Sequence, residues 1–280
     1  MVIKNKKLNI VIFGFTSSIG NFLSRKYYLK NHNLLLFSNN KQKFNKVKKN
    51  YTNNQTQEII LERFDITNSK KTKSIIKKNI KFFKKADLII STIGVQGEIN
   101  NFFNSNLKKF KKTFDINFFS HVFLLRDLYK IIRDNKRTLI ILFSGGGATS
   151  KRENFSSYSL SKIALVKLVE ILSTEIKTKN IRINAIAPGI IDSKMTRTIL
   201  KNKNKIEHKE FLKIKKAFKS SNKSLNKVYD LINLLLFKSG KNISGKILSS
   251  RWDNFKKWNE IELRKISSSD IFTMRRRQNF

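Results

Sequence analysis

Short apolar runs recur along the chain, separated by stretches whose apolar residues return every three or four positions. The first run, residues 8–14, reads Leu-Asn-Ile-Val-Ile-Phe-Gly. Its β-branched residues and its terminal glycine are typical of a strand that is buried on both faces. The stretch that follows, residues 18–29, places Ile19, Phe22 and Leu23 at helical spacing. The chain therefore begins with a predicted strand, a turn and a helix.

The same two patterns continue to residue 249. They predict strands at residues 8–14, 33–37, 57–64, 86–92, 137–143, 181–187 and 245–249, and helices at residues 18–29, 110–132 and 155–178. Strands that alternate with helices predict an α/β fold, here a doubly wound parallel sheet of about seven strands with helices on both faces. Because no repeat and no linker rich in Pro, Gly or Ser interrupts the pattern, we expect a single domain over residues 1–250 and a C-terminal tail over residues 251–280.

The composition excludes several classes of protein. Hydrophobic residues make up 40% of the 280 positions and include 23 Phe, which is enough for a core and excludes a disordered chain. The absence of Cys excludes disulfides, thiolate zinc sites and a Cys nucleophile. The three His are scattered, so we expect no metal site. No apolar run is long enough to span a membrane and the first residues resemble no signal peptide, so we expect a cytoplasmic protein without a membrane partner.

The formal net charge of +40 raises the question of nucleic-acid binding. The Lys residues are spread over the whole chain among many Asn and Ile, which is the mixture that an AT-biased genome produces. We therefore interpret the charge as a solvated basic surface and expect no specific nucleic-acid partner. The densest cluster, Arg275–Arg277, lies near the C-terminus.

The turn after the first predicted strand contains the first candidate chemistry. It reads Gly-Phe-Thr-Ser-Ser-Ile-Gly from Gly14 to Gly20. A glycine-bearing turn between a strand and a helix lets backbone N–H groups and the helix N-terminus approach a pyrophosphate. Taken alone, the same residues also suit an ordinary turn.

Tyr158 and Lys162 form the second candidate. Residues four apart share one face of a helix, so an ammonium group at Lys162 would lie near the phenol of Tyr158. A nearby cation lowers the pKa of a phenol toward the range that is useful for proton transfer. In a chain with this much Lys, one such pair is also expected by accident.

The other candidate residues follow in order along the predicted strands. After the glycine turn come Asp65, Gly94, Asn117, Ser144, Tyr158, Lys162, and Pro188 with Gly189. Nearly all of them fall at the carboxyl ends of strands, where doubly wound sheets bind ligands. Over residues 8–249 this set resembles the short-chain dehydrogenase/reductase family, which implies a Rossmann-type fold and an NAD(P)-dependent oxidoreductase.

The resemblance implies a dinucleotide site. Gly14 and Gly20 match the first and last glycines of the family's turn, and Ser18 stands in place of the middle one. Asp65 matches the acidic residue at the adenine edge or, alternatively, caps the following helix. Pro188 begins a segment that matches the one beside the nicotinamide carboxamide. The implied cofactor-binding residues are Gly14, Ser17, Ser18, Ile19, Gly20, Ser38, Asn39, Asp65, Gly94, Tyr158, Lys162, Pro188, Gly189 and Ser193.

The resemblance also implies four catalytic residues. Tyr158 would protonate a substrate carbonyl that Ser144 polarises, while Lys162 would lower the Tyr pKa and hold the nicotinamide ribose. Asn117 would kink its helix and hold a water of the proton relay. Ser144 lies one residue further from Tyr158 than is usual, and the three glycines that follow it suggest a one-residue insertion in that loop.

The end of the second predicted strand bears on the choice of cofactor. A carboxylate there would bind the ribose 2′-hydroxyl and repel a 2′-phosphate. The chain has Ser38 and Asn39 at this place, followed by Lys41 and Lys43, and no acidic residue. We therefore expect NADP(H) to be favoured over NAD(H).

The substrate remains open at this level. A carbonyl or alcohol compound is implied, and a basic rim would suit an anionic one, either a sugar or nucleotide-sugar ketone or a 3-oxoacyl thioester on an acidic carrier protein. The alternative from another class is a catalytically idle or basic nucleic-acid-binding protein on the same fold. An intact set of four catalytic residues favours the enzyme.

Three further expectations concern the outer parts of the chain. Residues 195–220 are amphipathic and match the family's substrate lid. The tail either covers the pocket, with its arginines binding phosphates, or is a disordered basic end. We also expect a homodimer or homotetramer through the helices of Asn117 and Tyr158, whose apolar residues exceed what one sheet face needs: Phe118, Phe119, Phe123, Leu124, Ile163, Leu165, Val166 and Val169.

Overall fold

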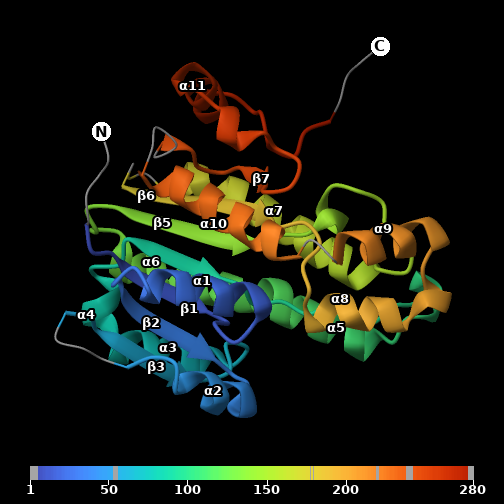
Figure 1. Ribbon diagram of the computed structural model, residues 1–280, viewed down its shortest axis with the longest axis horizontal. Helices are drawn as coiled ribbons and strands as arrows, with labels where there is room; N and C mark the ends of the chain where they lie inside the picture. The colour runs from blue at the N-terminus through green and yellow to red at the C-terminus, as the bar shows by residue number, and fades with distance from the viewer. Residues whose placement is uncertain are drawn as a thin grey trace.

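A seven-stranded parallel sheet forms the centre of the molecule (Figure 1). The structure, a computed structural model, describes residues 6–52, 56–176, 178, 180–218, 221–237 and 242–276. The strand order is β3-β2-β1-β4-β5-β6-β7. The strands are β1 (Asn9–Phe13), β2 (Asn33–Ser38), β3 (Ile59–Arg63), β4 (Leu88–Ser91), β5 (Thr138–Phe143), β6 (Ile181–Ala187) and β7 (Ile247–Ser249). Each lies within or beside one of the predicted ranges, so the predicted doubly wound, Rossmann-type sheet is confirmed.

Helices cover both faces of the sheet. They are α1 (Ser18–Tyr28), α2 (Lys41–Lys48), α3 (Ser69–Lys78), α4 (Ile80–Phe83), α5 (Leu107–Phe114), α6 (Ser120–Ile132), α7 (Ser156–Glu175), α8 (Lys194–Lys201), α9 (His208–Phe218), α10 (Ser221–Phe237) and α11 (Glu260–Ser268). One core cluster joins α1, α10 and α11 to the sheet, and a second joins α3, α6 and α7 to the opposite face. Within the described ranges, no helix is long and apolar enough to cross a membrane.

The predicted helix at residues 110–132 is interrupted. It consists of α5, a π-helical turn (η2, Asp115–Phe119) and α6. A π-helical turn accommodates one residue more than an α-helical turn does. The residue that the turn directs into the molecule is Asn117, which is fully buried.

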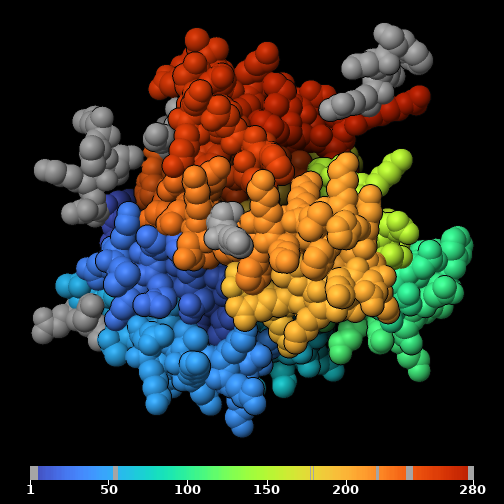
Figure 2. All heavy atoms as spheres, turned by 45° about the vertical axis from the view of Figure 1, so that its right-hand side comes forward, coloured from blue at the N-terminus to red at the C-terminus, as the bar shows by residue number. Residues whose placement is uncertain are grey.

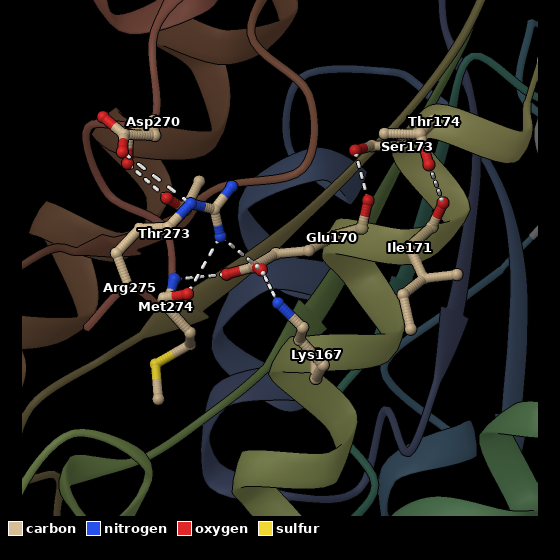
Figure 3. Close-up of polar contacts among 9 residues, drawn as sticks. All are labelled: Lys167, Glu170, Ile171, Ser173, Thr174, Asp270, Thr273, Met274 and Arg275. Carbon is tan, nitrogen blue, oxygen red and sulfur yellow. Dashed lines mark hydrogen bonds and ion pairs between the residues drawn. The ribbon is translucent and has the colours of Figure 1, made fainter.

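The C-terminal segment is folded onto the body, so the alternative of a disordered end is wrong as far as residue 276. Phe255, Leu263 and Ile266 belong to the main core cluster. The chain then crosses α7, where Glu170 accepts hydrogen bonds from the backbone N–H of Met274 and from Lys167 and pairs with Arg275 at 3.2 Å (Figure 3). Arg275 is thus held by carboxylates within the chain, and Arg277 lies outside the described residues.

The helices expected to form an oligomer interface are less apolar outside than the sequence suggested. Leu124, Leu165, Val166 and Val169 are buried in the core that covers the sheet, so counting them as surplus surface was wrong. Phe119 and Phe123 remain 43% and 41% exposed.

Candidate active site

A cavity of about 610 Å³ opens at the carboxyl ends of β1, β4, β5 and β6. Ten of the predicted site residues line it: Ser17, Ser18, Ile19, Gly94, Ser144, Tyr158, Lys162, Pro188, Gly189 and Ser193. The other six are not part of the lining: Gly14, Gly20, Ser38, Asn39, Asp65 and Asn117. Ten of the sixteen predicted site residues are therefore brought together at one edge of the sheet.

The glycine turn places the N-terminus of α1 in this cavity. Gly14 has a φ of +83°, and a Cβ at Gly20 would lie 2.3 Å from the carbonyl oxygen of Gly14. The two glycines therefore allow the helix to start directly against the turn. Ser17 caps α1, because its Oγ accepts a hydrogen bond of 3.0 Å from the N–H of Gly20. A helix N-terminus with free N–H groups at a cavity wall fits a pyrophosphate.

The residues beside β2 and β3 are arranged by local hydrogen bonds. Asp65 accepts from the N–H and the hydroxyl of Thr67 at 2.9 and 2.8 Å. The N-cap of α3 is Asn68, so the alternative role of Asp65 as that cap is wrong. Ser38 is buried and shares a 2.6 Å hydrogen bond with Thr16, while Asn39 is exposed. Lys43 reaches the cavity lining.

Tyr158 and Lys162 lie one turn apart on α7, and both are buried. Lys162 Nζ donates a 2.7 Å hydrogen bond to the carbonyl oxygen of Phe143 and lies 6.0 Å from the Tyr158 ring centre. Burial lowers the pKa of Lys162 to about 8. Burial raises the pKa of Tyr158, and the cation that opposes this rise is Arg152. Arg152 is thus a cation that the sequence did not indicate, and the lowering of this pKa by Lys162 stays a prediction.

Ser144 and the glycines after it adjoin the phenol. The Ser144 Oγ is buried and has no hydrogen-bond partner among the described residues. A Cβ at Gly145 would lie 2.2 Å from the Tyr158 hydroxyl, and one at Gly147 would lie 2.4 Å from Ser159 Oγ. A side chain at position 145, where the family's serine is usual, would collide with Tyr158 in this loop. An unpaired buried hydroxyl is costly, which favours a ligand oxygen as its partner.

Asn117 holds the loop after β4 from behind. Its Oδ1 accepts from the N–H of Val95 at 2.8 Å, and its Nδ2 donates to the carbonyl of Val95 and to Ser161, both at 3.0 Å. The amide therefore joins α7 to the loop that carries Gly94. One turn further, burial lowers the pKa of His121 to about 3, which keeps this imidazole neutral beside Lys162.

Several residues of the cavity wall could not be found from a sequence motif. Gln96 is 6% exposed, and neither end of its amide has a partner among the described residues. Arg152 stacks on Phe155 at 3.9 Å and donates two hydrogen bonds to Glu210 of α9. Neither residue belongs to a motif, and a single cation cannot be distinguished in a chain so rich in Lys. Residues 195–220, expected to form a lid, do contribute α8 and α9 to the lining.

Comparisons with known proteins agree with this geometry. The family model described as short chain dehydrogenase matches residues 8–204. An 11-beta-hydroxysteroid dehydrogenase A from Sesamum indicum is 23% identical over 187 residues, which cover 67% of this chain and 53% of the relative. A 3-oxoacyl-[acyl-carrier-protein] reductase from Rickettsia felis is 26% identical over 190 residues, which cover 66% of this chain and 73% of the relative. The chain thus aligns with little more than half of the first of these relatives.

Solved structures share the whole architecture. A short-chain dehydrogenase/reductase from Saccharomyces cerevisiae superposes with a TM-score of 0.76 at 21% identity, covering 90% of this chain and 98% of that one. A short chain dehydrogenase from Shigella flexneri 2a, complexed with NADP, superposes with a TM-score of 0.73 at 16% identity, covering 88% and 98%. These structures show the same fold as this chain, a parallel sheet flanked by helices. The chain belongs to the short-chain dehydrogenase/reductase family.

Proposed function

We propose that this protein is an NAD(P)-dependent oxidoreductase that interconverts a carbonyl and an alcohol, with Tyr158 as the acid and base. The observation that carries the proposal is the convergence of Tyr158, Lys162 and the unpaired Ser144 hydroxyl on one cavity. A phenol beside a second hydroxyl can donate two hydrogen bonds to one carbonyl oxygen. An idle protein on this fold, or a nucleic-acid-binding one, has no chemical need for this set.

The cavity fits a nicotinamide dinucleotide. The N-terminus of α1, with Ser17, Ser18 and Ile19, would hold the pyrophosphate. Lys162 would hold the ribose hydroxyls, and the segment from Pro188 to Ser193 would border the nicotinamide. Ser38, Asn39 and Asp65 would contact the adenosine half. When bound, the cofactor supplies or accepts the hydride.

The protein's own residues then handle the proton. Ser144 and Tyr158 donate hydrogen bonds to the substrate oxygen, which stabilises the negative charge that develops there during reduction. Tyr158 gives its proton to that oxygen and, in the opposite direction, removes it. Lys162 supplies a buried positive charge near the phenol, and Asn117 fixes the loop at Gly94 and would hold the relay water.

Tyr158→Phe tests this assignment. Removal of the phenol hydroxyl should lower kcat by at least about a hundredfold, because proton transfer is lost. NADPH binding, followed by quenching of Trp fluorescence, should stay nearly unchanged. The assay is NADPH oxidation with a panel of ketones. Unaltered turnover in the variant would rule out Tyr158 as the acid.

We infer a preference for NADP(H). No carboxylate follows β2, and Ser38, Asn39 and Lys43 can donate hydrogen bonds to a 2′-phosphate. The related structure that contains NADP supports use of this cofactor. We expect kcat/KM to be several-fold higher with NADPH than with NADH on one substrate. Equal values would contradict the interpretation of the strand end.

The cavity lining favours an anionic substrate. Basic residues outnumber acidic ones there: Lys43, Lys151, Arg152, Lys162, Lys194, Lys209, Lys213 and Arg251 against Glu207 and Glu210. Of the sugar and nucleotide-sugar ketones, the nucleotide sugars fit this charge because their phosphates are negative. The second candidate is a 3-oxoacyl group on an acidic carrier protein, which the Rickettsia relative favours. Relative kcat/KM values for the two substrate types distinguish them.

The remaining assignments complete the proposal. Residues 1–250 would form the catalytic domain, with a lid at residues 195–220, and the tail at 251–280 would support it. We propose a cytoplasmic homodimer or homotetramer that associates through α6 and α7.

A further inference from the structure

The loop between β4 and α5 presents apolar side chains to solvent. Phe102, Phe103 and Leu107 are 52%, 90% and 77% exposed, and we call these three residues the aromatic tip. Phe102 contacts the rings of Phe103 and Phe110 at 5.4 and 6.2 Å. In Figure 2 the green segment that includes α5 projects at the right-hand edge of the molecule. Exposed large apolar groups gathered on one projection mark an interaction surface.

The loop is held in this conformation by its own hydrogen bonds. Asn101 caps the short turn by accepting from the N–H of Phe103 at 3.0 Å, and Ser105 Oγ donates to the carbonyl of Phe102 at 2.7 Å. Asn106 caps α5 and donates its own N–H to Glu98 at 2.8 Å. The two Phe side chains are therefore presented by an ordered backbone.

The charged residues of helix α5, beside the aromatic tip, are all positive. Helix α5 carries Lys108, Lys109, Lys111 and Lys112, all exposed. Glu98 pairs with Lys109 at 3.2 Å, and no acidic residue occurs within α5. A second copy of the chain docked on this tip would bring Lys against Lys, which disfavours self-association here. A negatively charged surface is the complementary occupant.

We propose that the aromatic tip and the lysines of α5 dock the protein on an anionic lipid bilayer. A short helix with Lys on one side and Phe and Leu on the other lies at the boundary of headgroups and acyl chains. The Phe rings would enter that boundary, while the ammonium groups would contact anionic headgroups. This inference does not depend on the proposed activity, and it revises the expectation of no membrane partner.

Co-sedimentation with vesicles tests the proposal. The full chain should pellet with vesicles of equal parts phosphatidylcholine and phosphatidylglycerol at about 0.15 M salt, and hardly at all with phosphatidylcholine alone. Phe102→Ser with Phe103→Ser should weaken this binding at least about tenfold. The matched control is Leu29→Ser with Ile261→Ser, which removes two side chains of 76% and 78% exposure elsewhere and should leave binding unchanged.

The outcomes are distinct. Loss of vesicle binding in the Phe variant, with unchanged binding in the control variant, supports the proposal. Equal binding of wild type and the Phe variant would mean that charge alone attracts the protein, which overturns the proposal. Absence of vesicle binding by the wild type would also overturn it. If the Phe variant sediments more slowly than wild type without lipid, the aromatic tip contacts a second copy of the chain. If wild type binds an acidic carrier protein without lipid and the Phe variant does not, the aromatic tip contacts a protein partner. Either result overturns the lipid proposal.

Discussion

Arg152 places a positive charge beside Tyr158, although it belongs to no sequence motif. Its guanidinium lies 6.0 Å from the centre of the Tyr158 ring and is held there by stacking on Phe155 and by Glu210. Because a cation stabilises phenolate, Arg152 opposes the rise that burial imposes on the Tyr158 pKa. The side chain therefore joins α9 to Tyr158, the proposed acid and base.

Replacing Arg152 should shift the pH dependence of the reaction. Without the cation the Tyr158 pKa rises further, so less phenolate is present at a given alkaline pH. In Arg152→Met the rising limb of alcohol oxidation should move to higher pH, with kcat/KM several-fold lower at alkaline pH, whereas carbonyl reduction near neutrality should depend little on pH. Full pH profiles of kcat/KM measure this shift.

Arg152→Lys and Lys151→Met are the controls for that experiment. The first keeps a positive charge and should restore most of the wild-type profile. The second removes a neighbouring cation of the cavity lining, and it should leave the limb in place. A profile of Arg152→Met that coincides with wild type would falsify the electrostatic role.

Single residues of the site were predictable where a motif fixes them. Ser144 directly follows β5, and Tyr158 and Lys162 lie in the first two turns of α7, so all three reach the cavity. Gln96 and Arg152 were not predictable, since their placement depends on how loops fold over the sheet. The hydrogen bond from Lys162 to the carbonyl oxygen of Phe143 was not predictable either, because a sequence does not identify a backbone partner.

At the level of elements, the strands were the most predictable parts. Residues 10–13 of β1 are completely buried, and such strands read as continuous apolar runs. The spacing of apolar residues does not mark the π-helical turn, so α5 and α6 read as one helix, although the resemblance implied a kink at Asn117. The packing of the tail against the core could not be predicted. Its buried residues, among them Phe255, Leu263 and Ile266, are widely spaced among polar ones.

The contact between α7 and the tail should contribute to stability. Glu170 is buried and bonded to Lys167, Met274 and Arg275, and these bonds lower its pKa against the effect of burial. We expect Glu170→Ala to lower the free energy of unfolding by about 2 kcal/mol, because three donors lose a charged acceptor. Since the carboxylate form stabilises the fold, the difference should shrink as the pH falls below the usual range of a Glu.

Urea unfolding at neutral and acidic pH measures that difference. Lys167→Met provides the comparison, since its side chain is 51% exposed and the pair should contribute less than about 1 kcal/mol. Equal losses in the two variants would show that the tail contact does not depend on Glu170.

For the whole molecule, the net charge of +40 and the exposed aromatic residues set what it can associate with. Like charges keep copies apart unless an apolar face offsets the repulsion. Phe119 and Phe123, beside the buried part of α6, supply such a face.

We expect Phe119→Ser with Phe123→Ser to shift the proposed oligomer toward monomer. Sedimentation velocity at micromolar concentration measures this shift, and Leu29→Ser is the control that should be unaffected. A wild-type protein that is already monomeric would contradict the proposed assembly.

The π-helical turn at Asp115–Phe119 has a consequence for the phase of the helix on either side of it. One additional residue rotates α5 by about 100° about its axis relative to an uninterrupted continuation of α6. Removing one residue from this turn would put the two helices into a single register. The rotation would move Asn117 away from Val95 and swing Leu107 and Phe110 to another side of the axis. The inward amide and the outward apolar side chains of α5 therefore depend on the same single-residue insertion.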